Sequence, residues 1–335
     1  MPGSVPKSAV SQAWQYQADG PLTSSPTVAE GVVYQGTGRG TLVALELESG
    51  ELRWSHPVGG GLSGSLIVGK AVIVGSSKGT VTALDRDSGR ALWTTKLDGE
   101  VRGAPLDIGG AIAVGTSSGT VSLLSPKDGE AIWQASGLGH VNRSLAGDGR
   151  MVIVPAEPGR LIALDLSTGD QLWTAALAPD GGVGSPSIGR GLVFTATGLD
   201  GEPGSQAIVA VDIDTGVVRW RWASPTGDPV YSPALGDRMS YSVSEAGFAI
   251  ALDPRDGHEA WRSKTAGPAE ALAAIADDSV LIAGNGSTLA ALDASTGRIR
   301  WEVPIAGVPY APVAACGFVL VPSDLGSLTA FGAAS

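Results

Sequence analysis

The chain is built from short runs of apolar and β-branched residues that are separated by polar turns containing glycine. Val72-Ile73-Val74 and Val81-Thr82-Ala83-Leu84 are typical runs, and each is too short for an ordinary helix. Short runs of this composition, bounded by glycine, predict β-strands. We therefore expect an all-β protein.

One sequence motif recurs along nearly the whole chain. It consists of an apolar strand end, a turn closed by glycine, and a second strand that contains tryptophan. In the copy from Ala83 to Trp93, the tryptophan follows the turn glycine, Gly89, by four residues. Seven copies end at Trp54, Trp93, Trp133, Trp173, Trp220, Trp261 and Trp301. Their spacing of 39 to 47 residues, with four short strands in each unit, predicts the blades of a β-propeller.

The two ends of the chain complement each other. Trp14 lies 40 residues before Trp54, but no strands precede it, whereas the last repeat supplies strands around 317–321 and 327–331 and lacks a tryptophan strand. We therefore predict an eight-bladed β-propeller of four-stranded blades, closed by an N-terminal strand that completes the last blade. The predicted organisation is a tail (1–10), a single propeller (11–331, with 11–17 as the outer strand of the last blade) and a second tail (332–335).

The recurring tryptophans are expected to be structural. Eight equivalent side chains, one in each blade, are typical of packing between repeats rather than of chemistry. Trp14 joins the seven named above in this set.

The amino-acid composition limits the kinds of partner and metal that the chain is expected to bind. The net charge of −11 argues against nucleic acid, because phosphate binding needs a basic surface. The single cysteine, Cys316, excludes an internal disulfide and a cysteine metal cluster, and its apolar surroundings predict that it is buried. His56, His140 and His258 fall in different parts of the repeat, so we expect no metal site.

The chain shows no apolar signal-peptide core at its start. The uncharged stretch 305–322 contains Pro309 and Pro312 and matches two strands and a turn, so we expect no membrane span. We expect a soluble monomer that is either cytoplasmic or an extracytoplasmic domain whose targeting segment is absent.

The repeat motif now points to a family. Gly-x-Val-Tyr/Val-x-Gly followed by Leu-x-Ala-Leu-Asp-x-x-(Ser/Thr)-Gly-x-x-x-Trp resembles the quinoprotein-type (PQQ-like) β-propeller repeat over residues 11–331. This resemblance implies one of three roles: a quinoprotein dehydrogenase that holds pyrroloquinoline quinone (PQQ) and Ca²⁺ at the channel mouth, a BamB-like assembly scaffold, or a sensor propeller of a bacterial Ser/Thr kinase. Such dehydrogenases carry an adjacent cysteine pair and long inserts. This chain has one cysteine and one insert, at 197–206, so we expect no cofactor, with PQQ and Ca²⁺ as the alternative.

The loops that enter the innermost strands are where the repeats differ most in chemistry, and on a propeller they surround the channel mouth. They supply the candidate ligand-binding residues Arg102, His140, Asn142, Arg143, Asp228, Tyr231, Glu270 and Tyr310. Two arginines offer paired donors to a carboxylate or phosphate. A solvated rim with internal ion pairs is the alternative interpretation, and His140 as a catalytic base is a weaker one.

These observations favour a non-catalytic binding module, either a ligand-sensing or a protein-interaction domain, which includes the sensor part of a bacterial kinase. Its partner would be a protein or a small anionic ligand. The alternatives are a compact quinoprotein-like dehydrogenase that uses PQQ at the mouth, and a BamB-like scaffold.

Overall fold

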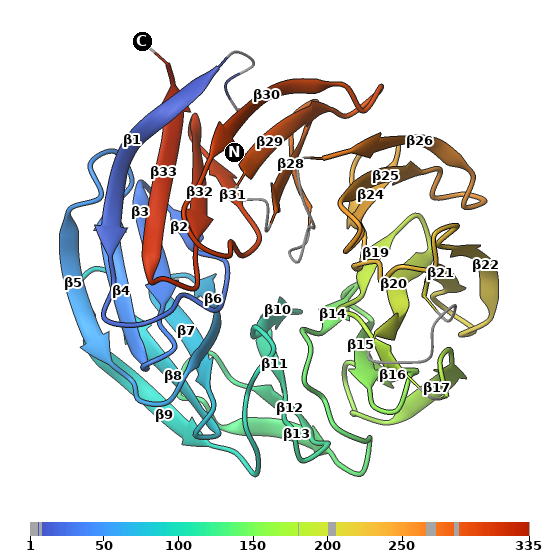
Figure 1. Cartoon of the computed structure of the whole chain (residues 1–335). Coiled ribbons are helices and arrows are strands. Elements are labelled where there is room, and N and C mark those ends of the chain that lie inside the picture. The colour runs from blue at the N-terminus through green and yellow to red at the C-terminus, as the bar shows by residue number, and fades with distance from the viewer. Residues whose placement is uncertain are drawn as a thin grey trace.

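Eight β-sheets form a closed ring around a central channel in the computed structural model (Figure 1). The structure describes residues 6, 9–179, 181–199, 206–265, 273–284 and 288–334. Each sheet is one blade whose strands run antiparallel from the channel outward. The predicted eight-bladed propeller is therefore confirmed, and within the described ranges no helix is long and apolar enough to cross a membrane.

Each blade contributes one strand to each of four concentric positions. The innermost strands are β2 (Thr27–Ala29), β6 (Leu62–Val68), β10 (Leu106–Ile108), β14 (Ala146–Gly147), β19 (Ser187–Gly189), β23 (Ala234–Leu235), β27 (Ala274–Ala276) and β31 (Val313–Ala315). The second strands are β3 (Val32–Gly36), β7 (Ala71–Ser76), β11 (Ala111–Gly115), β15 (Met151–Ala156), β20 (Leu192–Leu199), β24 (Ser240–Val243), β28 (Ser279–Gly284) and β32 (Phe318–Pro322).

The outer two positions complete the sheets. The third strands are β4 (Thr41–Glu46), β8 (Thr80–Asp85), β12 (Val121–Leu124), β16 (Arg160–Asp165), β21 (Ala207–Asp212), β25 (Phe248–Leu252), β29 (Thr288–Asp293) and β33 (Ser327–Ala333). The outermost strands are β5 (Leu52–Pro57), β9 (Ala91–Lys96), β13 (Ala131–Ala135), β17 (Gln171–Ala176), β22 (Val218–Ala223), β26 (Glu259–Lys264), β30 (Ile299–Pro304) and β1 (Val10–Gln17).

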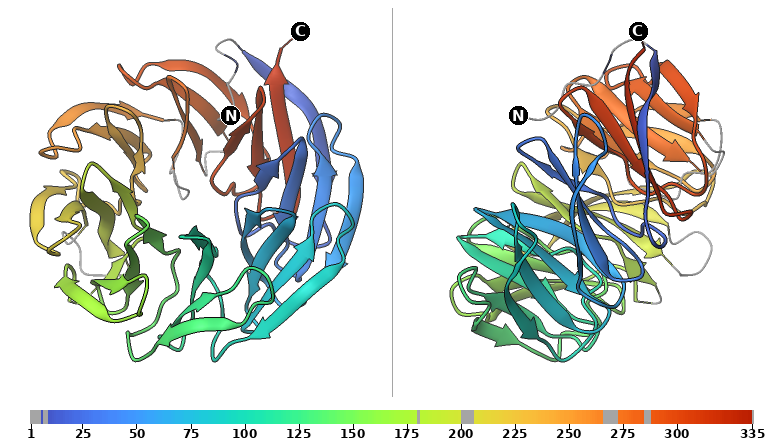
Figure 2. Two further views of the ribbon diagram at one scale, coloured as in Figure 1. Left: turned by 180° about the vertical axis from the view of Figure 1, so that it is seen from behind. Right: turned by 90° about the vertical axis from the view of Figure 1, so that its left-hand side faces the viewer.

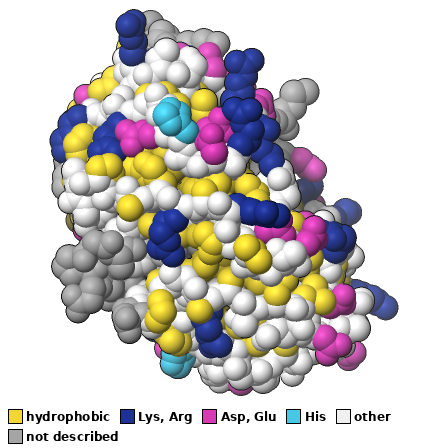
Figure 3. Space-filling view, turned by 90° about the vertical axis from the view of Figure 1, so that its right-hand side faces the viewer, with side chains coloured by type: hydrophobic (Ala, Val, Ile, Leu, Met, Phe, Trp, Pro, Cys, Tyr) yellow, Lys and Arg dark blue, Asp and Glu magenta, His cyan; other side chains and the backbone are white. Residues whose placement is uncertain are grey.

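The burial of each strand follows from its place in the ring. The second and third strands are buried along most of their length because neighbouring blades cover both faces. The outermost strands alternate between exposed and half-buried side chains, and apolar and charged groups share this outer surface (Figure 3). The core is thus a set of inter-blade layers, such as the cluster around Val121, Val152 and Ile162.

Ring closure joins the two ends of the chain. β1 pairs with β33 in an antiparallel register from Val10↔Ala333 to Gln17↔Ser327, and β33 pairs in turn with β32. Figure 2 shows the two strands side by side from behind and from the side. The predicted closure by the N-terminal strand is confirmed.

Two local features were not predicted correctly from the sequence. In the fifth blade, Gly184-Ser185-Pro186 interrupts the innermost strand, so β18 (Gly182–Val183) and β19 both pair with β20. The prediction that Cys316 is buried is wrong: it is exposed, in a left-handed conformation (φ 46°), at the turn between β31 and β32. The turn, and not the surrounding apolar run, decides the exposure of this side chain.

The recurring tryptophans join each blade to the next. The Nε1–H of Trp133, for example, donates to the carbonyl of Leu166 in the following blade at 2.8 Å. All eight residues of the set make such a bond, at 2.8 to 3.1 Å, to a carbonyl near the turn before the next outermost strand. Trp301 completes the row by donating to the carbonyl of Pro6.

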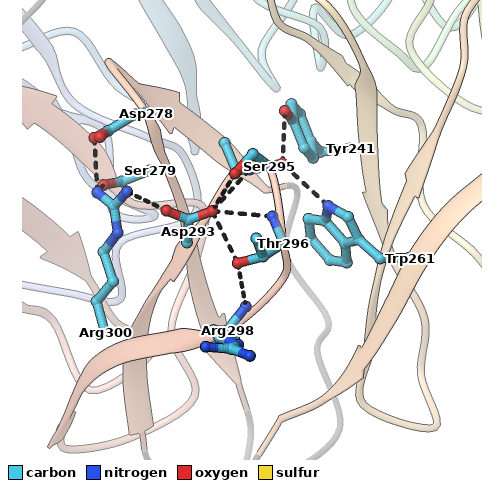
Figure 4. A network of polar contacts seen from close by, with 10 residues as sticks. Tyr241, Trp261, Asp278, Ser279, Asp293, Ser295, Thr296, Arg298 and Arg300 are labelled. Carbon is cyan, nitrogen blue, oxygen red and sulfur yellow. Dashed lines mark hydrogen bonds and ion pairs between the residues drawn. The ribbon is translucent and has the colours of Figure 1, made fainter.

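In five blades, an aspartate organises the turn that receives the tryptophan of the preceding blade. Asp293 accepts hydrogen bonds from Ser295, Thr296 and Arg300, which hold the pKa of its carboxyl well below its usual range (Figure 4). The indole of Trp261 donates to the carbonyl of Ala294 in the same turn. The turn formed by the Asp-Ser/Thr-Gly motif is therefore the surface against which the tryptophan of the preceding blade packs.

Candidate functional site

A cavity of about 460 Å³ occupies the channel mouth, where the innermost strands begin. Its lining comes from seven of the eight blades, because the corresponding part of the seventh blade, 266–272, lies outside the described residues. The lining residues are Thr23, Ser24, Ser25, Pro26, Thr27, Gly64, Ser65, Arg102, Ala104, Arg143, Ser144, Gly184, Ser185, Tyr231, Ser232, Tyr310 and Ala311.

Four of the predicted residues line this cavity: Arg102, Arg143, Tyr231 and Tyr310. Arg102 belongs to the third blade and Arg143 to the fourth, so neighbouring blades bring the two guanidinium groups to one cavity. Tyr231 enters from the sixth blade and Tyr310 from the eighth. Glu270, which was also predicted, lies outside the described residues, as does most of the insert, 200–205.

The two arginines differ in their surroundings. Arg102 forms an ion pair with Glu100 at 2.8 Å, and its side chain is 58% exposed. Arg143 is exposed and has no hydrogen-bond or ion-pair partner within the described part of the chain. A solvent-exposed ion pair of this kind is weak, so the Glu100 carboxylate does not bar Arg102 from a second anion.

Three predicted residues lie apart from the cavity lining. The His140 ring contacts the carbonyl of Ser117, and the Asn142 amide donates to Glu157 at 3.1 Å. The Oδ1 atom of Asn142 is buried and has no partner among the described residues. These contacts hold both side chains against the loop between β15 and β16 and the loop between β11 and β12.

Asp228, the third of these, has a local structural role. Its carboxylate accepts hydrogen bonds from the Ala246 amide at 3.0 Å and from Ser224 at 3.0 Å. Burial raises the pKa of Asp228, but the hydrogen bonds from Ser244, Ala246 and Ser224 outweigh this effect and lower the pKa overall. The carboxylate therefore joins its own loop to the loop between β24 and β25, and it does not line the cavity.

The cavity also contains a row of serines that were not among the predicted site residues. The Ala104 amide donates to the Ser144 hydroxyl at 3.1 Å, and the Ser144 amide donates to the Ser185 hydroxyl at 3.1 Å. The Ala196 amide donates to the Ser232 hydroxyl at 3.2 Å. The repeated Ser-Pro motif marks two of these serines, Ser185 and Ser232, so the sequence did carry a signal for them.

On the opposite side of the channel the hydroxyl groups are oriented differently. Ser25 donates to the carbonyl of Ala311 at 3.0 Å, and Thr27 donates to the carbonyl of Ser65 at 2.7 Å. The Ser24 Oγ atom is buried and has no hydrogen-bond partner among the described residues. A second cavity of about 430 Å³ shares Thr23, Ser24, Gly64 and Arg102 with the first and extends toward the second blade.

The donor set of the mouth does not fit the Ca²⁺ that accompanies PQQ. Calcium prefers several carboxylate and carbonyl oxygens. No Asp or Glu is among the described residues that line the cavity, and no described cluster of three or more His, Cys, Asp or Glu could hold a metal. We therefore assign no catalytic step to this site.

Comparison with known proteins identifies similar chains. The family model described as "Outer membrane protein assembly factor BamB" matches residues 8–145, 138–238 and 245–335. An outer membrane protein assembly factor BamB from Bordetella pertussis is 29% identical over 151 residues, which is 39% of this chain and 39% of that protein. The aligned part is thus less than half of either chain.

Solved structures share the fold at low sequence identity. BamB from Moraxella catarrhalis superposes with a TM-score of 0.79 at 18% identity, covering 97% of this chain and all of that chain. A quinohemoprotein alcohol dehydrogenase from Pseudomonas putida superposes with a TM-score of 0.71 at 15% identity, covering 97% of this chain and 77% of that chain. Both likenesses concern the fold alone.

Proposed function

We propose that this chain, which belongs to the propeller family described as outer membrane protein assembly factor BamB, is a non-catalytic scaffold that binds other proteins. The family match spans nearly the whole propeller, and the relative that shares 29% identity is an assembly factor. As part of the same proposal, we place the protein outside the cytoplasm. A sensor role beside a kinase domain stays a prediction from the repeat alone.

The observation that carries this proposal is a row of exposed aliphatic side chains on the outer circumference. Leu92, Ile132 and Leu172 directly precede the recurring tryptophans of β9, β13 and β17, in three adjacent blades. They are 54%, 56% and 50% exposed. Neighbouring exposed apolar side chains on a soluble surface are typical of a protein-binding site.

Internal comparison shows that the fold does not require apolar residues at this position. Arg53, Arg219 and Arg300 occupy it in the first, fifth and seventh blades. Each of these arginines pairs with the carboxylate that lies seven residues earlier. These three blades also expose an aliphatic side chain, but one residue earlier in the strand, at Leu52, Val218 and Ile299. The second, third and fourth blades differ in that an aliphatic residue replaces the paired arginine directly before the tryptophan.

The test is a triple substitution, Leu92→Glu with Ile132→Glu and Leu172→Glu. We expect the melting temperature to stay nearly unchanged, because the side chains are exposed, while proteins of the envelope assembly machinery cease to co-purify with the tagged chain from its own host. Ile299→Glu, at a site that is 45% exposed elsewhere on the ring, is the matched control. Co-purification of the same proteins with the triple variant would contradict the proposal.

The quinoprotein dehydrogenase is the second candidate, because such an enzyme shares the fold. Titration with PQQ, with and without Ca²⁺, followed by tryptophan fluorescence and melting temperature, distinguishes it from the scaffold. We expect no Ca²⁺-dependent binding, for the reason given by the donor set. Saturable binding that needs Ca²⁺ would favour the enzyme.

A further inference from the structure

We propose that the channel mouth is an oxyanion-binding site for a small carboxylate or phosphate, with Arg143, Arg102 and the hydroxyl groups of Ser144, Ser185 and Ser232 as its donors. This site lies in the centre of the ring, whereas the aliphatic row lies on its circumference, so the two proposals can fail separately.

The first argument is the sign of the local charge. The chain has 33 acidic against 22 basic residues. The described lining of the cavity nevertheless includes two arginines and no carboxylate. Arg143 in particular is a permanent cation with no partner among the described residues, so an anion that enters the cavity meets uncompensated positive charge.

The second argument is the direction of the hydroxyl groups. A serine hydroxyl has one proton to donate and two lone pairs to accept with. Ser144, Ser185 and Ser232 each use a lone pair to accept a backbone N–H, and no acceptor for their protons is present among the described residues. These three protons are therefore available to a ligand in the cavity.

The third argument is the asymmetry of the ring. On the side of the first, second and eighth blades, Ser25 and Thr27 already donate to carbonyl groups. Ser24, whose buried Oγ has no partner among the described residues, is an exception on this side. Ser144, Ser185 and Ser232 instead lie on the arc from the third to the sixth blade, together with both arginines. A carboxylate or phosphate group that accepts several hydrogen bonds from this arc would be held in a fixed orientation.

The size of the cavity sets the class of ligand. A volume of about 460 Å³ suits a metabolite-sized molecule, and the adjoining cavity of about 430 Å³ leaves room for a substituent that passes Arg102. We therefore expect a compact molecule with one or more carboxylate or phosphate groups.

The test is isothermal titration at low ionic strength with inorganic phosphate, citrate and metal-free PQQ as separate probes. We expect at least one probe to bind the wild-type protein. Arg102→Gln with Arg143→Gln should weaken this binding at least about tenfold, because paired guanidinium donors are lost. Ser185→Ala should weaken it about threefold to tenfold by removing one neutral donor.

A matched control removes the same charge elsewhere. Arg39 and Lys78 are exposed and do not line the cavity, so Arg39→Gln with Lys78→Gln should leave binding within about twofold of the wild type. If both double variants weakened anion binding equally, the anion would be attracted non-specifically by positive charge. This result would overturn the proposal of a site at the channel mouth. Absence of binding by all three probes at about 10 mM, or binding by PQQ only in the presence of Ca²⁺, would also overturn it.

The relative affinities of the three probes indicate the chemical class of the natural ligand. Preference for phosphate indicates a phosphorylated ligand, and preference for citrate or PQQ indicates a polycarboxylate. Unchanged melting of each variant without ligand confirms that lost binding does not come from lost folding.

Discussion

At the residue scale, each turn glycine packs directly against the tryptophan of the preceding blade. Gly129 adopts φ +73°, and a Cβ atom at this position would lie 2.4 Å from the Trp93 ring. The position therefore excludes other residues for two separate reasons: a left-handed backbone and direct contact with an indole. The sequence motif showed the spacing of glycine and tryptophan within one blade, but not that each glycine carries the tryptophan of its neighbour.

A pair of glycine substitutions separates these two reasons. Gly110 has φ +79°, and a Cβ atom added to it would have no other atom within 4 Å, so Gly110→Ala should cost about 1–2 kcal/mol of unfolding free energy through backbone strain alone. Gly129→Ala should cost about 1–3 kcal/mol more, because the added methyl group would displace both the Trp93 ring and the Thr95 hydroxyl, each 2.4 Å from the added Cβ atom. Urea unfolding measures both, and equal costs would show that the indole contact is unimportant.

The residues of the candidate site differ in how well their roles could be predicted from the sequence. Arg102 and Arg143 could be predicted because the residue type at the start of the innermost strand varies between blades, whereas the structural positions of the repeat stay alike. Asp228 occupies a similar position in the sequence, yet its carboxylate accepts hydrogen bonds from Ser224 in its own loop and from Ala246 in the loop between β24 and β25. Sequence gives the residue type at such a position, whereas local hydrogen bonding decides its direction.

At the element scale, the turn before the outermost strand depends on an ionised aspartate in five of the blades. Hydrogen bonds and ion pairs from Arg219 and Arg255 lower the pKa of Asp212 and Asp253 to about 2. Asp85, Asp165 and Asp293 have lowered pKa values in the equivalent turns, through bonds from serine and threonine and, for Asp293, Arg300. Because each of these turns receives the tryptophan of the preceding blade, the same carboxylates support the joints of the ring.

These shifts predict acid sensitivity. An Asp whose pKa is lower in the folded state contributes stability that is complete above its unfolded pKa of about 3.9 and is lost as the pH falls toward about 2. Unfolding free energy should therefore fall between about pH 5 and pH 2. Asp253→Asn should show a smaller fall than the wild type in urea titrations across this range. Asp237→Asn, outside these turns, is the control, and an identical pH dependence in all three proteins would contradict the assignment.

The order of the strands and the closing strand could be predicted because the same pattern of strands occurs several times along the sequence. The interruption between β18 and β19 could not, since it depends on a turn that differs in one blade. Cys316 shares its left-handed turn with Glu30, Arg190 and Asp277, so comparison of the repeats, and not the apolar run around it, was the guide to its exposure. The Ser-Pro motif marked Ser185 and Ser232, but the direction of the serine hydroxyls depends on hydrogen bonds between adjacent blades, which the sequence of one blade does not describe.

At the scale of the whole molecule, one strand closes the ring. β1 buries Val10 and Trp14, with 6% and 8% exposure, and it covers the edge of β33. Burial of these two side chains alone contributes on the order of 4 kcal/mol. Closure also removes the two free sheet edges that an open ring would expose.

Removal of residues 1–17 should therefore lower the melting temperature of the entire propeller, and not only of the last blade. Removal of residues 1–5, which leaves Pro6 and β1 in place, is the matched control. Differential scanning calorimetry measures both, and unchanged unfolding of the longer truncation would contradict the role of the closing strand.

The register of this seam has a mechanical consequence. Val10 pairs with Ala333, and the Ala334 amide donates to the Ala9 carbonyl at 3.0 Å, so both chain ends leave the ring at the same end of one strand pair. A load applied between the termini would act on these hydrogen bonds one after another, as in a zipper, instead of shearing them together. Tension along the chain would thus open the ring at its seam under a small force, while a load applied across the blades would meet the full resistance of the interlocked joints.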